Sequence, residues 1–170
     1  PRLPEGRLAE PYALVPWPLE LALEPGETPL ALIPAPGTAP EDIRALVEAD
    51  ALHHRLFGAA RRAVSLPRVR GGRALAFAAD PALAPGAYRL DFAEAITLAS
   101  ADADGRRHGL IALLHLLHGA TVAPETFRFP ATGRIADAPR HGWRGCHLDV
   151  SRQFWPTADV LRFLDILAWY

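Results

Sequence analysis

Residues 87–119 read AYRLDFAEAITLASADADGRRHGLIALLHLLHG, and this stretch decides the fold. Apolar and polar residues alternate on both sides of a break at 93–95, so the pattern predicts a β-hairpin over 87–100. The residues that follow predict an acidic helix start and an apolar helix over 105–118, which Gly119 ends. The leucines of this helix point in nearly every direction, which indicates a helix buried on a sheet.

The flanking sequence predicts the other members of this layer. Period-two alternation indicates a half-buried strand over 19–24 that turns at Pro25-Gly26. A helix is expected to begin at a Thr38 capping box and to end at Gly58. The fold class is therefore α+β, a mostly antiparallel sheet with two helices on one face. Short strands are also expected at 30–33 and 74–79, and Arg106-Arg107 as a solvated helix start.

Composition limits the classes of function. Half of the 170 residues are apolar, and the net charge of −1 argues against a nucleic-acid binder, which needs clustered positive charge. No apolar run approaches the roughly 18–20 residues of a membrane span, and no signal peptide is recognisable, so the compartment stays open. The single cysteine, Cys146, excludes an internal disulfide. Because the chain does not begin with Met, we expect it to be part of a longer protein.

The pattern changes after the Pro- and Gly-rich stretch 130–142. A short apolar strand is expected over 145–150, with Cys146 buried in it as an inert thiol. A helix capped by Thr157 is then expected over 157–170. One βα unit cannot bury both faces of its strand, so we expect it to begin a second domain.

Several motifs in this part resemble the entry to the catalytic barrel of glycoside hydrolase family 20, the β-N-acetylhexosaminidases. They recur at fixed spacing over residues 135–156, whereas the layer upstream is similar to the family's non-catalytic α/β domain. The final residues 165–170, DILAWY, are similar to the family's first barrel helix. The motifs are Ile135-Ala-Asp137-Ala-Pro139-Arg140, Trp143-Arg144-Gly145, Leu148-Asp149-Val150-Ser151-Arg152, Phe154 and Pro156.

The resemblance implies a non-catalytic α+β accessory domain at 7–138 and the start of a truncated (β/α)8 barrel at 139–170. It implies a parent enzyme that removes terminal N-acetylglucosamine or N-acetylgalactosamine from a glycan. The substrate's own acetamido oxygen would then serve as nucleophile, and no cofactor would be needed. The family's Asp-Glu pair is absent from this chain, because no such dipeptide follows Trp143. We therefore expect no catalytic residue here and an inactive fragment.

One substrate-binding role of the family maps onto Arg144, whose planar guanidinium suits a grip on two neighbouring sugar hydroxyls. The plainer alternative is a structural arginine paired with a carboxylate. Asp149 and Arg152 are expected to form a salt bridge that fixes a loop. Gln153 stands where the family commonly has His, which leaves the role of that position open.

The histidines suggest no metal site. His108, His115 and His118 have helical spacing but lack an acid or cysteine at matching positions, so metal binding is not expected. His53 and His54 face opposite ways on their helix and indicate no site. Trp143 and Trp155 fit packing at a domain junction better than stacking on a sugar.

Two functions from different classes stay open. The chain is either the N-terminal part of a β-N-acetylhexosaminidase or a stand-alone carbohydrate-binding or interaction module. In either case, a βα unit without its neighbours would expose apolar side chains. Self-association through 143–170 is therefore an expected partner contact, alongside an N-acetylhexosamine glycan in the parent enzyme; no nucleic acid or membrane contact is expected.

Overall fold

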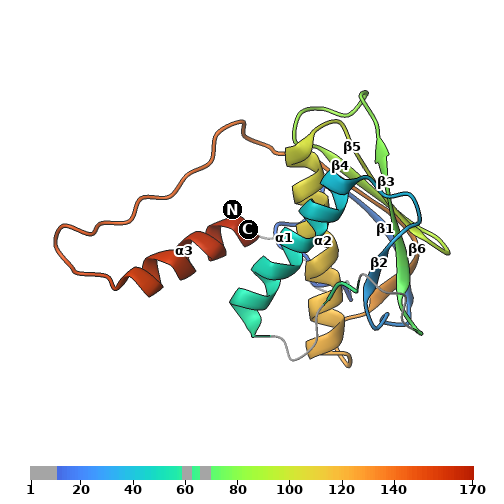
Figure 1. Ribbon diagram of the computed structural model, residues 1–170, viewed down its shortest axis with the longest axis horizontal. Coiled ribbons are helices and arrows are strands. Elements are labelled where there is room, and N and C mark those ends of the chain that lie inside the picture. The colour runs from blue at the N-terminus through green and yellow to red at the C-terminus, as the bar shows by residue number, and fades with distance from the viewer. Residues whose placement is uncertain (1–10, 59–62, 66–69) are drawn as a thin grey trace.

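The computed structural model describes residues 11–58, 63–65 and 70–170, so the first four residues of the expected domain 7–138 lie outside it. The described chain forms one six-stranded sheet and three helices (Figure 1). The elements are β1 (Glu20–Gly26), β2 (Leu32–Pro34), α1 (Pro40–Phe57), β3 (Arg73–Ala79), β4 (Tyr88–Phe92), β5 (Ile96–Ser100), α2 (Ala103–Val122), β6 (Phe129–Asp137) and α3 (Thr157–Trp169).

The sheet has the strand order β1-β6-β4-β5-β3-β2. The three pairs on the β1 side are antiparallel, and the predicted hairpin is confirmed as β4 and β5, in which Leu90 lies opposite Leu98. The pairs β2–β3 and β3–β5 are parallel. Helix α1 carries the chain back between β2 and β3, and the hairpin places β5, rather than β4, beside β3. The expectation of a mostly antiparallel α+β sheet is thus confirmed, with a parallel edge that the hairpin spacing did not predict.

Two local stop signals were misread. Pro25-Gly26 does not turn the chain, because β1 continues through both residues with a bulge after Glu24. Gly119 does not end α2, which runs on to Val122. A Cβ at Gly119 would lie 2.2 Å from the Cβ of Ala13, so this glycine serves close packing.

The sequence predicted the end of α1 correctly but not its start. Gly58 ends the helix in the left-handed conformation at φ 56°, as predicted. Thr38 does not cap it, because its hydroxyl donates to the Ala35 carbonyl at 2.7 Å. The helix begins instead at Pro40, whose missing N–H costs nothing at a first helical position.

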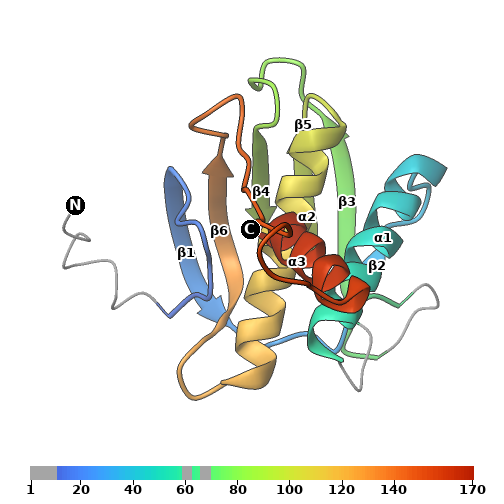
Figure 2. The same cartoon turned by 90° about the vertical axis from the view of Figure 1, so that its left-hand side faces the viewer.

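Both α1 and α2 cover the same face of the sheet, as predicted (Figure 2). Apolar side chains of α2 form the centre of the core against β4, β5 and β6. The Arg106 guanidinium at the start of α2 donates to Asp42 of α1, so it ties the two helices together and is not the solvated group expected. The α2 leucines with at most 1% exposure are Leu110, Leu113, Leu114 and Leu116.

The strand predicted over 145–150 is not formed. A strand needs hydrogen-bonding neighbours, and within the described residues this segment has none; it follows β6 through an arch that leaves the body of the molecule (Figure 1). Cys146 is consequently exposed, not buried, and so is Trp143. Helix α3 does form, with Pro156 at its cap in place of the predicted Thr157.

We expect Gly105→Ala to destabilise the protein although alanine is the better helix former. A Cβ at Gly105 would lie 2.1 Å from the carbonyl oxygen of Ala87, so the α2–β4 contact must open. The free energy of unfolding in urea should fall by about 1–3 kcal/mol. Gly142→Ala, where no atom lies within 4 Å, is the control and should stay within about 0.5 kcal/mol. A Gly105→Ala protein as stable as the wild type would contradict the packing argument.

Candidate functional site

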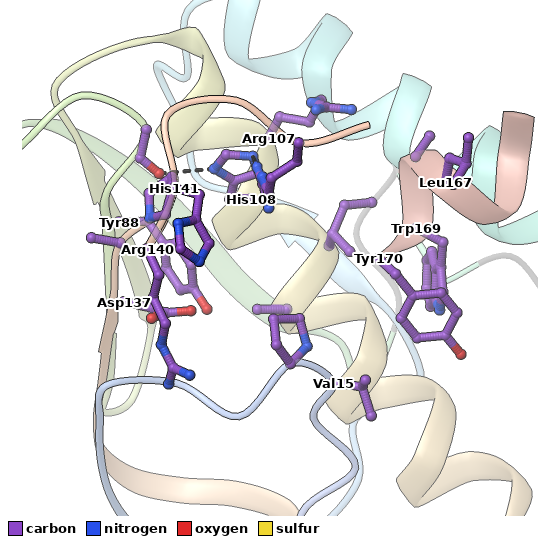
Figure 3. Close-up of a pocket in the computed structure, with 18 of the residues that line it drawn as sticks. Val15, Tyr88, Arg107, His108, Asp137, Arg140, His141, Leu167, Trp169 and Tyr170 are labelled. Atoms are coloured by element: carbon purple, nitrogen blue, oxygen red, sulfur yellow. Dashed lines mark hydrogen bonds between the residues drawn. The ribbon is translucent and has the colours of Figure 1, made fainter. Parts of the chain in front are cut away.

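A cavity of about 810 Å3 lies where the first half of α2, the segment after β6 and the end of α3 come together (Figure 3). Arginine and histidine side chains gather on one side of it, and Trp169 and Tyr170 form the opposite side (Figure 3). Its size is within the range of small-ligand sites. The arginine, histidine and acidic side chains that line it are Arg107, His108, His115, Asp137, Arg140, His141 and Arg144.

Arg144 reaches the cavity through a contact with α2. Its Nη2 lies 3.2 Å from Nε2 of His108, and His108 Nδ1 lies 2.8 Å from the Gly86 carbonyl oxygen. The carbonyl can only accept, so Nδ1 carries the proton and Nε2 is free to accept from the guanidinium. The backbone of the turn before β4 therefore sets the tautomer of the imidazole that Arg144 meets.

Asp102 holds this turn in place. Its carboxylate accepts from Gly105 N at 2.7 Å, which caps α2, and from Gly86 N at 2.9 Å. These two backbone hydrogen bonds, with the Gly105 bond the stronger cause, lower the pKa of Asp102. One carboxylate thus fixes both the start of α2 and Gly86, the residue whose carbonyl orients His108.

Asp137 bears the only side-chain carboxylate among the described residues that line the cavity. It accepts from Leu19 N at 3.2 Å, and burial raises its pKa. The neighbouring Tyr88 phenol has a raised pKa, chiefly through burial and secondly through the charge of Asp137. The three arginines around the cavity outnumber this acid, so the site favours ligands that offer acceptor oxygens.

The predicted pair Asp149 and Arg152 is brought together outside the cavity. Arg152 Nε donates to Asp149 Oδ2 at 2.7 Å, and Asp149 Oδ1 accepts from Ser151 N at 2.9 Å. Trp155 Nε1 donates to the Asp149 carbonyl at 3.2 Å, so Trp155 closes this loop. Gln153 is exposed.

The sequence reading missed a contact between His53 and His118, 65 positions apart. His53 Nε2 lies 2.9 Å from His118 Nδ1 at the α1–α2 interface. The signal was the helical spacing of His53 from the buried residues Leu46, Ala49 and Leu56, which places it on the inner face. Among residues 11–58, 63–65 and 70–170, no three His, Cys, Asp or Glu side chains are arranged to hold a metal ion. Within the same ranges, no helix has the length and apolarity that crossing a membrane requires.

Comparison with known proteins agrees with the motifs. Residues 141–170 match the model of glycosyl hydrolase family 20, catalytic domain. A β-hexosaminidase from Akkermansia muciniphila is 38% identical over 91 residues, which is 53% of this chain but 18% of that protein. The chain therefore spans a minor part of the length of such relatives.

Solved structures agree over almost the whole chain. A mutant Streptomyces plicatus β-hexosaminidase, solved in complex with its product GlcNAc, superposes with a TM-score of 0.60 at 27% identity. The superposition covers 96% of this chain and 33% of that one. The fold is shared also with an exo-β-N-acetylglucosaminidase from Vibrio harveyi, with a TM-score of 0.65 at 24% identity over 95% of this chain and 24% of that one. These matches show that the chain is similar to parts of β-hexosaminidases, in line with the resemblance of its motifs.

Asp102→Ala should lower the melting temperature by about 2–4 °C, because α2 loses its cap and the Gly86 N–H its acceptor. Asp104→Ala, in the same helical turn but outside the cap, is the control and should change it by less than half as much. The folded pKa of Asp102 is lowered, so its contribution is present above the ordinary value of 3.8 and lost as pH falls through the folded pKa. The difference in melting temperature between the wild type and Asp102→Ala should accordingly narrow below about pH 3.8. An equal fall in melting temperature for Asp102→Ala and Asp104→Ala at pH 7 would contradict the capping role.

Proposed function

We propose that this chain is the N-terminal part of a β-N-acetylhexosaminidase, comprising a non-catalytic domain at 7–138 and the start of the catalytic barrel at 139–170. The observation that carries the proposal is the match of 141–170 to the family 20 catalytic domain. The superposition on the Streptomyces plicatus enzyme covers 96% of the chain, which includes both the layer of sheet and helices and the segment after β6. The parent protein would hydrolyse terminal N-acetylglucosamine or N-acetylgalactosamine by substrate-assisted retaining catalysis.

The acids of the barrel part support an inactive fragment. Only Asp149, Asp159 and Asp165 follow Trp143. Asp149 pairs with Arg152 and Asp165 pairs with Arg55, each at less than 3 Å. Asp159 is exposed in the first turn of α3, and none of the three acids has an adjacent Glu as in the family's pair. The general acid and the group that orients the acetamide would then be supplied by other residues of the parent enzyme.

Arg144 would bind hydroxyls of the terminal sugar. In the part of the chain that the structure describes, it forms no ion pair with a carboxylate, which weakens the alternative of a structural arginine. One Nη contacts His108 and the guanidinium is otherwise exposed, so it retains donors for a pair of hydroxyls. His108, a residue of the proposed non-catalytic domain, would then help to orient Arg144, the residue of the catalytic domain that binds the sugar.

A second candidate is a stand-alone glycan-binding module, which the cavity beside α2 favours because arginines and aromatic rings share its lining. Titration of N-acetylglucosamine and chitobiose into the 170-residue polypeptide distinguishes the two proposals. Specific binding that Arg144→Ala abolishes would favour the module. The exposed leucines of α3, Leu161, Leu164 and Leu167, make self-association the expected behaviour of an isolated fragment.

We expect the 170-residue polypeptide alone to release no phenol from an aryl N-acetyl-β-glucosaminide. The missing acid and acetamide-orienting pair removes general acid catalysis, which alone contributes about 10²–10⁴ in rate. Turnover that co-purifies with the folded polypeptide through two chromatographic steps would refute this.

In the longer protein, Arg144→Lys should reduce kcat/KM for an N-acetylhexosaminide by about tenfold or more, because lysine keeps the charge but loses the planar pair of donors. Arg162→Lys, an exposed arginine on α3, is the matched control and should leave kcat/KM unchanged. A change below about threefold for Arg144→Lys, under 1 kcal/mol, would show that Arg144 does not bind the sugar.

A further inference from the structure

Three histidines meet one tryptophan where α1, α2 and α3 come together. His53 of α1 and the α2 residues His115 and His118 form what we call the histidine cluster, and Trp169 of α3 lies against it. The ring centroid of Trp169 is 4.4 Å from that of His115 and 5.7 Å from that of His53. Phe57 completes the group at 4.1 Å from His118 and 5.2 Å from Trp169.

Trp169 is the principal attachment of α3. It is 3% exposed and is the only buried residue of the helix. The leucines of α3 are exposed, and the other side-chain link to α1 is the Arg55–Asp165 ion pair at 2.8 Å. The pair is bidentate, since Arg55 Nε also donates to Asp165 Oδ2 at 3.0 Å, but the Arg55 side chain is 55% exposed, so solvent screens the attraction. The buried indole, packed on the surface that the histidine cluster offers, therefore contributes most to the docking of α3.

This surface suits neutral imidazoles. His53 and His115 are 6% and 7% exposed, and burial penalises a charge on either. The 2.9 Å contact between His53 Nε2 and His118 Nδ1 needs one N–H and one lone pair, so it fails when both rings are protonated. His53 Nδ1 is buried without a hydrogen-bond partner, and a proton there would be an unsatisfied donor.

Few charges near the cluster offset such a proton. On α1, Asp50 favours protonation of His53 whereas His54 opposes it, and Arg55 is already paired with Asp165 of α3. The cluster histidines themselves repel a proton: a charge on His118 lowers the pKa of both His53 and His115. The segment before β1 contributes the Val15 N–H, which donates weakly to His115 Nδ1 at 3.5 Å.

We propose that the histidine cluster is an acid-sensitive latch, in which protonation below neutral pH releases α3 from α1 and α2. The proposal rests on the packing of this chain alone and does not depend on the glycosidase activity proposed above. In a longer protein the same event would loosen the first helix of the second domain from the layer that holds it.

The direction of the pH dependence follows from burial. Burial, the largest cause, lowers the pKa of all three histidines, and that of His115 falls to about 4, although contact with the Trp169 backbone acts the other way. The docked state therefore binds fewer protons than the released state. Its stability is complete above about pH 6.5 and is lost as pH falls toward 4. For His115 alone the loss in the docking equilibrium at pH 5 is at most about 30-fold, the value reached where release returns this imidazole to its ordinary pKa.

The ion pair between the helices does not share this window. The hydrogen bond from Arg55 lowers the pKa of Asp165, so the carboxylate stays charged at pH 5. Release between pH 7.5 and 5.0 would thus report on the histidines. Asp137 has a raised pKa and lies across the cavity, so Asp137→Asn is included to exclude its titration.

Nuclear magnetic resonance of the chain at pH 7.5 and 5.0 tests the latch. A short Gly-Ser extension after Tyr170 keeps the terminal carboxylate away from His115. We expect contacts between the Trp169 and Phe57 rings to vanish at pH 5.0. Amide exchange in α3, corrected for its intrinsic pH dependence, should lose protection by several-fold and up to about 30-fold, while β4 and β5 keep theirs. Unchanged contacts and protection at pH 5.0, or equal loss in the sheet, would overturn the proposal.

Variants separate the cluster from other titrations. His53→Gln with His118→Asn keeps a hydrogen-bonding pair that cannot be protonated, and with His115→Asn added, α3 should stay docked at pH 5.0. His54→Asn, the exposed neighbour on α1, is the matched control and should release α3 as the wild type does. If the triple variant does not fold, ring-carbon titration in the wild type decides: protonation of the cluster with α3 still docked overturns the latch, and coincident midpoints support it.

Discussion

Helix α2 is apolar on nearly every side, and the need to cover it organises the rest of the structure. The sheet covers one side through β4, β5 and β6, and α1 covers another. Gly105, Gly109 and Gly119 each stand where a Cβ would lie within 2.3 Å of a neighbouring atom, so the backbone of α2 lies unusually close to its surroundings. Such contact leaves little freedom in the position of α2, and side chains carried on it become fixed reference points for whatever packs nearby.

Local patterns predicted the elements of this layer because each pattern reflects burial on one face. The alternation in β4 and β5 and the all-round leucines of α2 indicated the hairpin and the central helix. Glycines were read as stops because sequence spacing does not show what lies across from them. Gly119 lies against Ala13, and Gly26 lies against Ala131 in the neighbouring strand, so tertiary contact decided both positions.

Residues 138–170, which follow β6, show which features a sequence motif can predict and which depend on contact with neighbouring elements. The family motifs indicated Arg144 and the pair Asp149 and Arg152, because unusual residues at fixed spacing can be recognised without knowledge of the fold. The strand predicted at 145–150 does not form, because within the described residues no neighbouring strand pairs with it. The contact of His53 with His118 escaped notice for a related reason: it joins two helices whose packing no local pattern reveals.

The two ends of α2 contact the segment 138–170 at different points, so the layer that contains α2 positions this segment at two places. Near its start, His108 contacts Arg144 under the control of the turn that Asp102 holds. Near its end, the histidine cluster receives Trp169 of α3. Because one rigid helix bears both contacts, the positions of the segment after β6 and of α3 are both fixed relative to α2. A change at either contact alters the position of residues 138–170 relative to α2. The sheet on the other side of α2 bears neither contact and keeps its place.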